Sequence, residues 1–124
     1  MLPLPTILIV EDEEPVRELL VQLFTGDGYP VRIAVHGAQA LEIVTKEHAD
    51  LVLSDVMMPR MGGAELCRRL KSEPATAGIP VILMTSAGRI AADGTGCDGF
   101  IAKPFDLSEV EDLVRRWLPE VRAR

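Results

Sequence analysis

The fold of this 124-residue chain is decided by one stretch, Leu51-Val52-Leu53-Ser54-Asp55-Val56-Met57-Met58-Pro59. Three apolar residues lead into a carboxylate, and a proline closes the turn shortly afterwards. An apolar run of this length, bounded by a turn signal, predicts a buried strand. Open α/β sheets bind their ligands beyond the carboxyl ends of their strands, so Asp55 is predicted to lie at the functional edge of such a sheet.

Apolar or β-branched runs on both sides of this stretch predict further strands, and helical periodicity separates them. The predicted strands are 6–10, 31–35, 51–54, 79–84 and 100–102, with 31–35 nearer the edge because its pattern alternates more. Helices are predicted with Pro15 in the first turn of the first one, then over 38–47, from Gly62 onward, briefly at 89–92, and from Asp106 to Leu118. Five alternations of strand and helix predict βαβ units around a central parallel sheet, in one domain that covers residues 1–124.

Two helices have an apolar stripe that predicts which side chains face the core. The sequence Asp106-x-x-Glu109 is a capping signal for the last helix. The third helix is predicted to direct Leu66, Cys67 and Leu70 inward. The predicted core residues of the first helix are Val16, Leu19, Leu20, Leu23 and Phe24, and those of the last are Leu107, Val110, Leu113, Val114, Trp117 and Leu118.

Composition excludes several classes of protein. A net charge of -6 and a pI of about 4.9 argue against a nucleic-acid-binding surface, which needs a basic face. No apolar stretch approaches the roughly 20 residues that span a bilayer, and the N-terminus lacks the basic and apolar regions of a secretory signal. Cys67 and Cys97 lie far apart in the sequence, which favours a reduced, cytoplasmic protein.

Polar side chains follow four of the predicted strands. Glu11 and Asp12 follow the first strand, Asp55 the third, Thr85 the fourth and Lys103 the fifth. Three neighbouring carboxylates repel one another unless a proton or a cation neutralises them, and oxygen ligands of this kind suit Mg²⁺. Such a site fits phosphoryl transfer, in which a carboxylate attacks, Lys103 pairs with one phosphoryl oxygen and Thr85 hydrogen-bonds another.

Taken together, four motifs resemble the signature of receiver domains of two-component response regulators. They are Ile7-Leu8-Ile9-Val10-Glu11-Asp12-Glu13, Ser54-Asp55-Val56-Met57-Met58-Pro59-x-Met61-x-Gly63, Met84-Thr85-Ser86 and Lys103-Pro104-Phe105. The resemblance covers essentially the whole chain. It implies a flavodoxin-like (βα)5 three-layer sandwich with strand order 2-1-3-4-5 and a short or irregular fourth helix.

The resemblance also implies a role for individual residues. Asp55 would be the phosphoacceptor, and Mg²⁺ would be held by Asp12, Asp55 and the backbone carbonyl of Met57, with Glu11 acting mostly through water. Thr85 would swing toward the phosphoryl group while the aromatic ring of a switch residue turns inward. Phe100 would be this aromatic switch residue. Lys103 would contact the phosphoryl group, and the peptide bond between Lys103 and Pro104 would be cis.

Four features of the sequence depart from the family pattern. Glu11 replaces the commoner Asp, and Gly62 stands where an Asp often precedes Gly63, which is expected to loosen the start of the third helix. Met57 and Ala87 are apolar where water reaches the acyl phosphate, which predicts slow self-hydrolysis. Only residues 86–102 separate Thr85 from Lys103, about one helical turn less than the family usually has.

Other interpretations remain open at the level of sequence. Asp55 could be a plain helix cap. A haloacid-dehalogenase-like phosphatase would need a second acid where Met57 stands, and a nucleotide- or flavin-binding module would need a glycine loop where acids follow the first strand. A degenerate receiver that binds partners without phosphorylation is the last alternative.

The favoured interpretation is a signalling protein that catalyses only its own phosphorylation and dephosphorylation, and is otherwise no enzyme. Its expected phosphodonor is a sensor histidine kinase or a histidine phosphotransfer protein. Because little sequence follows the last predicted helix, any output is expected to act through a protein partner, with no contact to nucleic acid or membrane. The expected state is a monomer or a phosphorylation-dependent dimer.

Overall fold

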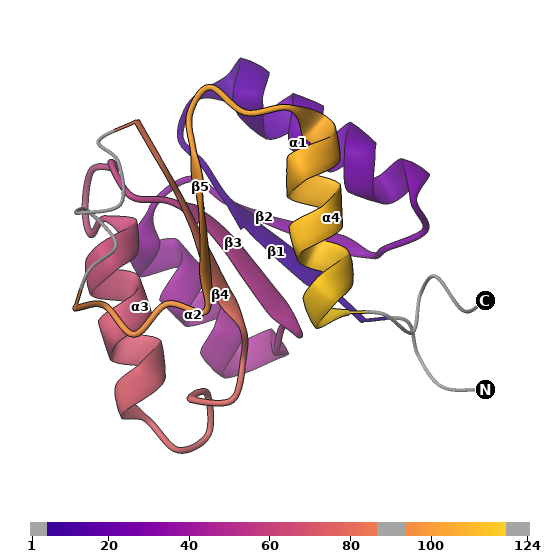
Figure 1. The fold of residues 1–124 in the computed structure, drawn as a ribbon. Coiled ribbons are helices and arrows are strands. Elements are labelled where there is room, and N and C mark those ends of the chain that lie inside the picture. The colour runs from indigo at the N-terminus through magenta and orange to yellow at the C-terminus, as the bar shows by residue number, and fades with distance from the viewer. Residues whose placement is uncertain (1–4, 87–93, 119–124) are drawn as a thin grey trace.

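The computed structural model describes residues 5–86 and 94–118, which form a parallel sheet between two layers of helices (Figure 1). The strands are β1 (Ile7–Val10), β2 (Val31–Ala34), β3 (Leu51–Asp55), β4 (Val81–Thr85) and β5 (Gly99–Ala102). The helices are α1 (Glu14–Gly26), α2 (Gly37–Glu47), α3 (Gly63–Ser72) and α4 (Leu107–Trp117). The helix predicted at 89–92 lies outside the described residues.

The sheet has the order β2-β1-β3-β4-β5, which confirms the flavodoxin-like expectation and puts β3 at its centre. Every residue of β1, β3 and β4 is buried, because helices cover both faces of a parallel sheet. β2 lies at one edge, as its weaker alternating pattern predicts. The register pairs Asp55 with Met84 and Thr85 with Ala102, so the carboxyl ends of neighbouring strands lie level.

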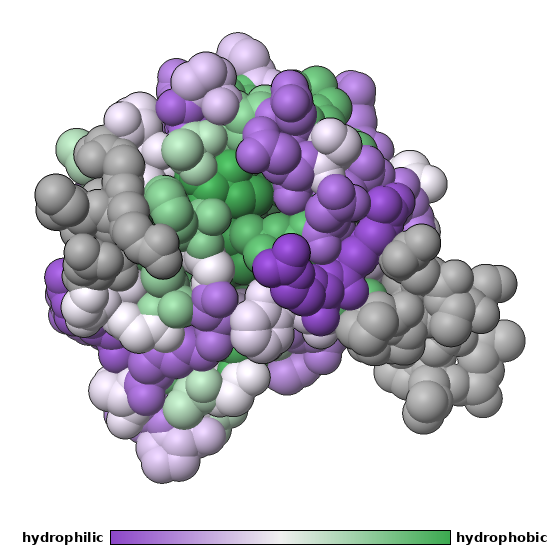
Figure 2. All heavy atoms as spheres, in the orientation of Figure 1, coloured by the Kyte–Doolittle hydropathy of each residue, from purple (hydrophilic) through white to green (hydrophobic). Residues whose placement is uncertain are grey.

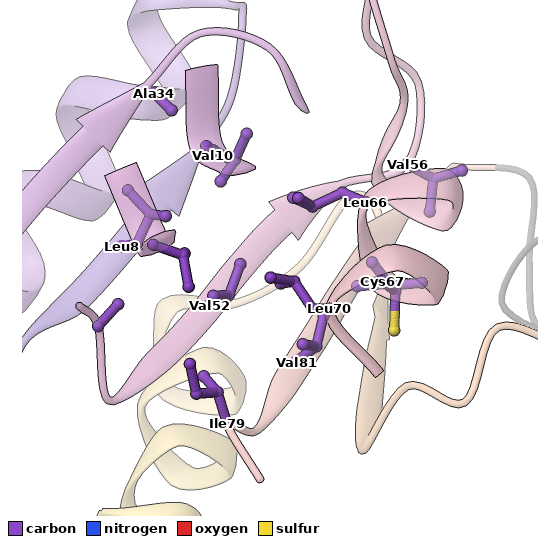
Figure 3. Packing of buried hydrophobic residues seen from close by; sticks show 14 residues of the cluster. Leu8, Val10, Ala34, Val52, Val56, Leu66, Cys67, Leu70, Ile79 and Val81 are labelled. Carbon is purple, nitrogen blue, oxygen red and sulfur yellow. The ribbon is translucent and has the colours of Figure 1, made fainter. Parts of the chain in front are cut away.

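Each face of the sheet has its own hydrophobic core. Helices α1 and α4 cover one face with Leu20, Phe24, Val110 and Val114, all fully buried. Helices α2 and α3 cover the other face, where Leu66 and Leu70 point toward the strands and Cys67 is buried beside them (Figure 3). The predicted inward face of the third helix is therefore confirmed.

Two residues assigned to apolar stripes are not buried. Leu19 is 47% exposed, because Leu20 and Phe24 take the places directly over the sheet and leave Leu19 at the margin of α1. Trp117 is 38% exposed, since the core of the last helix is filled by residues four apart: Val110, Val114 and Leu118. The prediction that these two side chains belong to the core was wrong.

The last helix begins as its capping sequence predicts. The Glu109 carboxylate accepts a hydrogen bond from the backbone N–H of Asp106 at 3.0 Å.

Hydrophobic residues reach the surface in a hollow beside α4, shown in green in Figure 2. Among the described residues, no helix has the length and the apolar character needed to cross a membrane.

Candidate functional site

The polar residues predicted to converge do so at the carboxyl edge of the sheet. Asp55 ends β3 and Thr85 ends β4, while Glu11 directly follows β1 and Lys103 directly follows β5. The backbone N–H of Lys103 donates to the carbonyl of Thr85 at 2.8 Å, which continues the pairing of β4 with β5 past its last residue. The carboxyl ends of four strands thus meet at this edge.

Lys103 is the cation of this site. Its ammonium lies 3.1 Å from Glu11, 3.2 Å from Asp55 and 3.7 Å from Glu13. Its side chain is 16% exposed, while Glu11 is fully buried and Asp55 nearly so. Sequence reasoning placed Lys103 here but assigned it to a phosphoryl oxygen and did not anticipate that Glu11 binds it.

Burial raises the pKa of Glu11, and the neighbouring charge of Asp55 raises it further. Hydrogen bonds from Lys103 and from the backbone N–H of Glu13 act in the opposite direction without cancelling the rise in this pKa. Burial also acts to lower the pKa of Lys103, but its contacts with Glu11 and Asp55 outweigh burial and leave that pKa above the ordinary value. The site thus concentrates negative charge around one ammonium.

The backbone and its neighbours hold Glu11 in place. Its N–H donates to the carbonyl of Ala34 at 3.0 Å, and its own carbonyl accepts from the Arg17 guanidinium at 3.0 Å. Its second carboxylate oxygen accepts from the N–H of Glu13 at 3.2 Å. The first two contacts fix the backbone of Glu11, and the N–H of Glu13 together with the Lys103 ammonium holds its carboxylate.

Three acidic side chains form a cluster that could hold a metal ion. Ligand oxygens of Glu11, Asp12 and Asp55 all lie within 4.8 Å of one another. Glu11 and Asp55 are buried, whereas Asp12 is exposed and leaves the cluster open to solvent. Carboxylate oxygens with access to water suit a hard divalent cation.

The loop after β3 approaches Asp55 closely. The N–H of Met57 donates to the Asp55 carboxylate at 3.4 Å, and the N–H of Gly63 donates to the carbonyl of Val56 at 2.9 Å. A Cβ on Gly63 would lie 2.2 Å from the backbone oxygen of Asp55, so only glycine lets α3 begin this near. Helix α3 starts at this residue, with Gly62 as its N-cap lacking a side-chain bond. A loosened helix start at Gly62 stays a prediction.

The remaining predicted positions are placed as follows. The peptide bond between Lys103 and Pro104 is cis, as expected. Thr85 is buried beside Lys103. Phe100 is partly buried and packs against the core on the α2–α3 face, and its role as a switch stays a prediction. Ala87 lies outside the described residues.

Two further features lie outside this edge. A cavity of about 490 Å³ lies near the opposite ends of β3 and β4, among residues such as Leu41, His48 and Ile79, and contains no part of the acidic cluster. His36 caps α2, its Nδ1 accepting from the N–H of Gln39 at 3.1 Å. This cap was not predicted, because histidine is an uncommon capping residue.

Comparison with known proteins agrees with this geometry. The family model of the response regulator receiver domain matches residues 7–115. The chain belongs to this family. Receiver domains of this kind are phosphorylation-activated components of two-component signalling, and the chain fits that function.

Among curated relatives, this receiver domain is 42% identical over 117 residues to sporulation initiation phosphotransferase F of Bacillus subtilis, covering 91% of this chain and 93% of that protein. It spans about half, 52%, of the length of the response regulator MprA of Mycolicibacterium vanbaalenii. The receiver domain of a signal transduction histidine kinase from Syntrophus aciditrophicus is 35% identical, with a TM-score of 0.88 over 97% of this chain and 94% of that one.

The receiver domain of the sensor histidine kinase PA1611 from Pseudomonas aeruginosa has the same fold at 24% identity, with a TM-score of 0.87 over 94% of this chain and 99% of that one. That structure has a magnesium ion coordinated in its active-site cleft.

Proposed function

We propose that Asp55 is the phosphoacceptor of this receiver domain and takes its phosphoryl group from a phosphohistidine of a sensor histidine kinase or histidine phosphotransfer protein. One observation carries this assignment: the nearly buried Asp55 carboxylate lies 3.2 Å from Lys103 and within the acidic cluster of Glu11 and Asp12. In the transfer, an Asp55 oxygen bonds to phosphorus as the phosphorus–nitrogen bond breaks, and the imidazole leaves with the bonding electron pair.

The carboxylates fit Mg²⁺, because three oxygen ligands lie close together and one remains open to water. Glu11, Asp12 and Asp55 would hold it, together with the backbone carbonyl of Met57. When bound, the cation offsets negative charge on the phosphoryl oxygens.

The other residues of the site position the phosphoryl group and report its presence. Lys103 exchanges a carboxylate partner for a phosphoryl oxygen, and the Thr85 hydroxyl donates to another. Movement of Thr85 draws Phe100 inward and alters the surface around β5 and α4 for a downstream protein partner or a second copy of the chain.

A groove beside the site fits the phosphodonor protein. It has a volume of about 390 Å³ and is lined by Val16 and Leu19 of α1 and by Pro104 and Phe105 after β5. Lys103 also lines it, so the groove is continuous with the site. The exposed, apolar Leu19 suits a protein partner, whereas a small phosphodonor needs no such contact.

We also propose that the chain turns over no external substrate. Met57 stands where an aspartyl-phosphate phosphatase would carry a second acid to protonate its leaving group. Phosphorylation and loss of the phosphoryl group at Asp55 are the only reactions we assign to it.

Mass spectrometry after incubation with acetyl phosphate and Mg²⁺ tests the phosphoacceptor. We expect one added phosphoryl group on the wild type and on the control Asp112→Asn, whose carboxylate is exposed on α4, and none on Asp55→Asn. Equal labelling of Asp55→Asn would refute the assignment.

A second comparison tests the groove. Leu19→Asp should slow transfer from a phosphorylated histidine phosphotransfer protein and leave labelling by acetyl phosphate unchanged. Ile33→Asp, at a similarly exposed apolar residue of β2, is the control and should affect neither. Equal slowing with both donors would show that Leu19 affects the chemistry instead of docking.

A further inference from the structure

The loop between β3 and α3 contains two consecutive non-glycine residues in a left-handed backbone conformation. Arg60 has a φ of 56° and Met61 a φ of 100°. L-amino acids rarely adopt such angles, and proteins retain them only where neighbouring structure imposes them. The loop therefore needs an external anchor.

The anchor is the first residue of α2. The backbone N–H of Gly37 donates to the carbonyl of Met61 at 2.9 Å. At the start of the loop, the Val56 carbonyl accepts from the N–H of Gly63 at 2.9 Å. The segment that carries Met57 is thus held at one end by its own helix and at the other by α2.

Position 37 has no room for a side chain. A Cβ there would lie 2.4 Å from the carbonyl oxygen of Met61 and 2.9 Å from its Cγ. The nearer atom belongs to the backbone, so a larger residue must displace either the loop or the start of α2. The φ of Gly37 is not among the positive values, so close approach alone requires glycine here.

We propose that Gly37 is a positioning residue for the phosphoryl-transfer site. Its N–H and its missing Cβ fix Met61, Met61 fixes the strained loop, and the loop sets where the backbone carbonyl of Met57 lies relative to Asp55. This inference rests on the proposed function, because it takes Asp55 and Met57 as parts of the Mg²⁺ site.

Calorimetric titration with Mg²⁺ tests the proposal on the metal affinity itself. Gly37→Ala should bind Mg²⁺ about tenfold more weakly than the wild type, which lies within the range typical of coupled sites. The matched controls are Gly26→Ala and Gly78→Ala, because a Cβ at either position meets nothing within 4 Å and neither has a positive φ. Both controls should bind as the wild type does. An unchanged affinity of Gly37→Ala would overturn the proposal.

Amide hydrogen exchange of the wild-type protein gives a second test that needs no variant to fold. Coupling between two sites is reciprocal. If the hydrogen bond from Gly37 to Met61 strengthens Mg²⁺ binding by a given factor, Mg²⁺ must slow exchange of the Gly37 amide by the same factor. The control is the amide of Asp50, which donates to the carbonyl of Thr6 at the opposite edge of the sheet. Equal protection of both amides would reflect global stabilisation alone and would overturn the proposal.

Failure of the proposed function looks different from failure of this inference. If Asp55→Asn binds Mg²⁺ as tightly as the wild type, the assignment of the site is wrong and the inference falls with it. If Asp55→Asn loses Mg²⁺ affinity while Gly37→Ala keeps it and the Gly37 amide gains no extra protection, only the role of Gly37 is wrong.

Discussion

The ammonium nitrogen of Lys103 lies 3.1 Å from a carboxylate oxygen of Glu11, a residue 92 positions earlier in the chain. Glu11 is fully buried, so this contact compensates a charge that water does not reach. The same ammonium lies 3.2 Å from Asp55. One side chain therefore joins the ends of β1, β3 and β5, and its removal has predictable consequences.

Lys103→Met should lower the free energy of unfolding near neutral pH, because Glu11 and Asp55 lose their shared cation. The pKa of Lys103 is raised in the folded protein, so its contribution is fully present below pH 10.5, the ordinary lysine value. The contribution is lost as the pH rises through the higher folded pKa. Urea unfolding of both proteins at several pH values measures this difference, and a gap that widens in strong alkali would contradict the prediction.

Asp55→Asn should stabilise the protein in the absence of divalent cations, because it removes a charge that repels Glu11 while Lys103 keeps its contact with Glu11. Burial raises the pKa of Glu11 and the charge of Asp55 raises it further, so removal of that charge relieves repulsion at a buried site. Thermal unfolding should also show that Mg²⁺ raises the melting temperature of the wild type more than that of Asp55→Asn. An equal rise in both proteins would argue against Asp55 as a ligand.

The two thiols should react at different rates with iodoacetamide. Burial raises the pKa of the Cys67 thiol to about 11, so less than about 1% of the Cys67 thiol is ionised near neutral pH. Cys97 is only partly buried. Peptide mass spectrometry should find Cys97 alkylated first and Cys67 alkylated only after denaturation. Equal rates in the folded protein would contradict the burial of Cys67.

Lys71→Met should destabilise the fold by about 2 kcal/mol. The Lys71 ammonium lies 2.7 Å from Asp98 and donates to the carbonyl of Ile79 at 2.8 Å, so it ties α3 to the chain segments before β4 and β5. Lys46→Met is the control, because its pair with Glu42 is exposed and is worth about 0.5 kcal/mol or less. Urea unfolding compares the two variants, and equal losses would show that the Lys71 contacts carry no special weight.

Met57→Asn should shorten the lifetime of the phosphorylated protein roughly fivefold, since one oriented water bond is worth about 1 kcal/mol. Met57 is 67% exposed and donates its N–H to the Asp55 carboxylate, so its side chain lies where water approaches. An amide in its place can orient an attacking water. Loss of the phosphoryl group with time, followed by mass spectrometry, gives both half-lives. The prediction would be wrong if the phosphorylated wild type had a half-life no longer than that of phosphorylated Met57→Asn.

Much of the fold could be predicted because local and long-range signals agree. The unbroken apolar runs of β1, β3 and β4 are those of strands buried on both faces, and the weaker β2 lies at the edge. Parallel strands bring their carboxyl ends to one edge, which is why the sequence alone places Asp55 and Lys103 together.

What could not be predicted depends on fine angles and on contacts distant in sequence. Periodicity assigns Leu19 and Trp117 to apolar faces, but the rotation of each helix over the sheet leaves both side chains partly exposed. The sequence marks Lys71 and Asp98 only as ordinary surface charges. That they form a close pair follows from the path of the chain before β5.

The arrangement of Lys103 between Glu11 and Asp55 has one more consequence. In the proposed function, a Mg²⁺ ion bound to these carboxylates would compete with the Lys103 ammonium for them, so its uptake would be an ion exchange rather than a simple addition. The ammonium is covalently attached to the backbone and would stay near the site. It would then be able to pair with a phosphoryl group on Asp55.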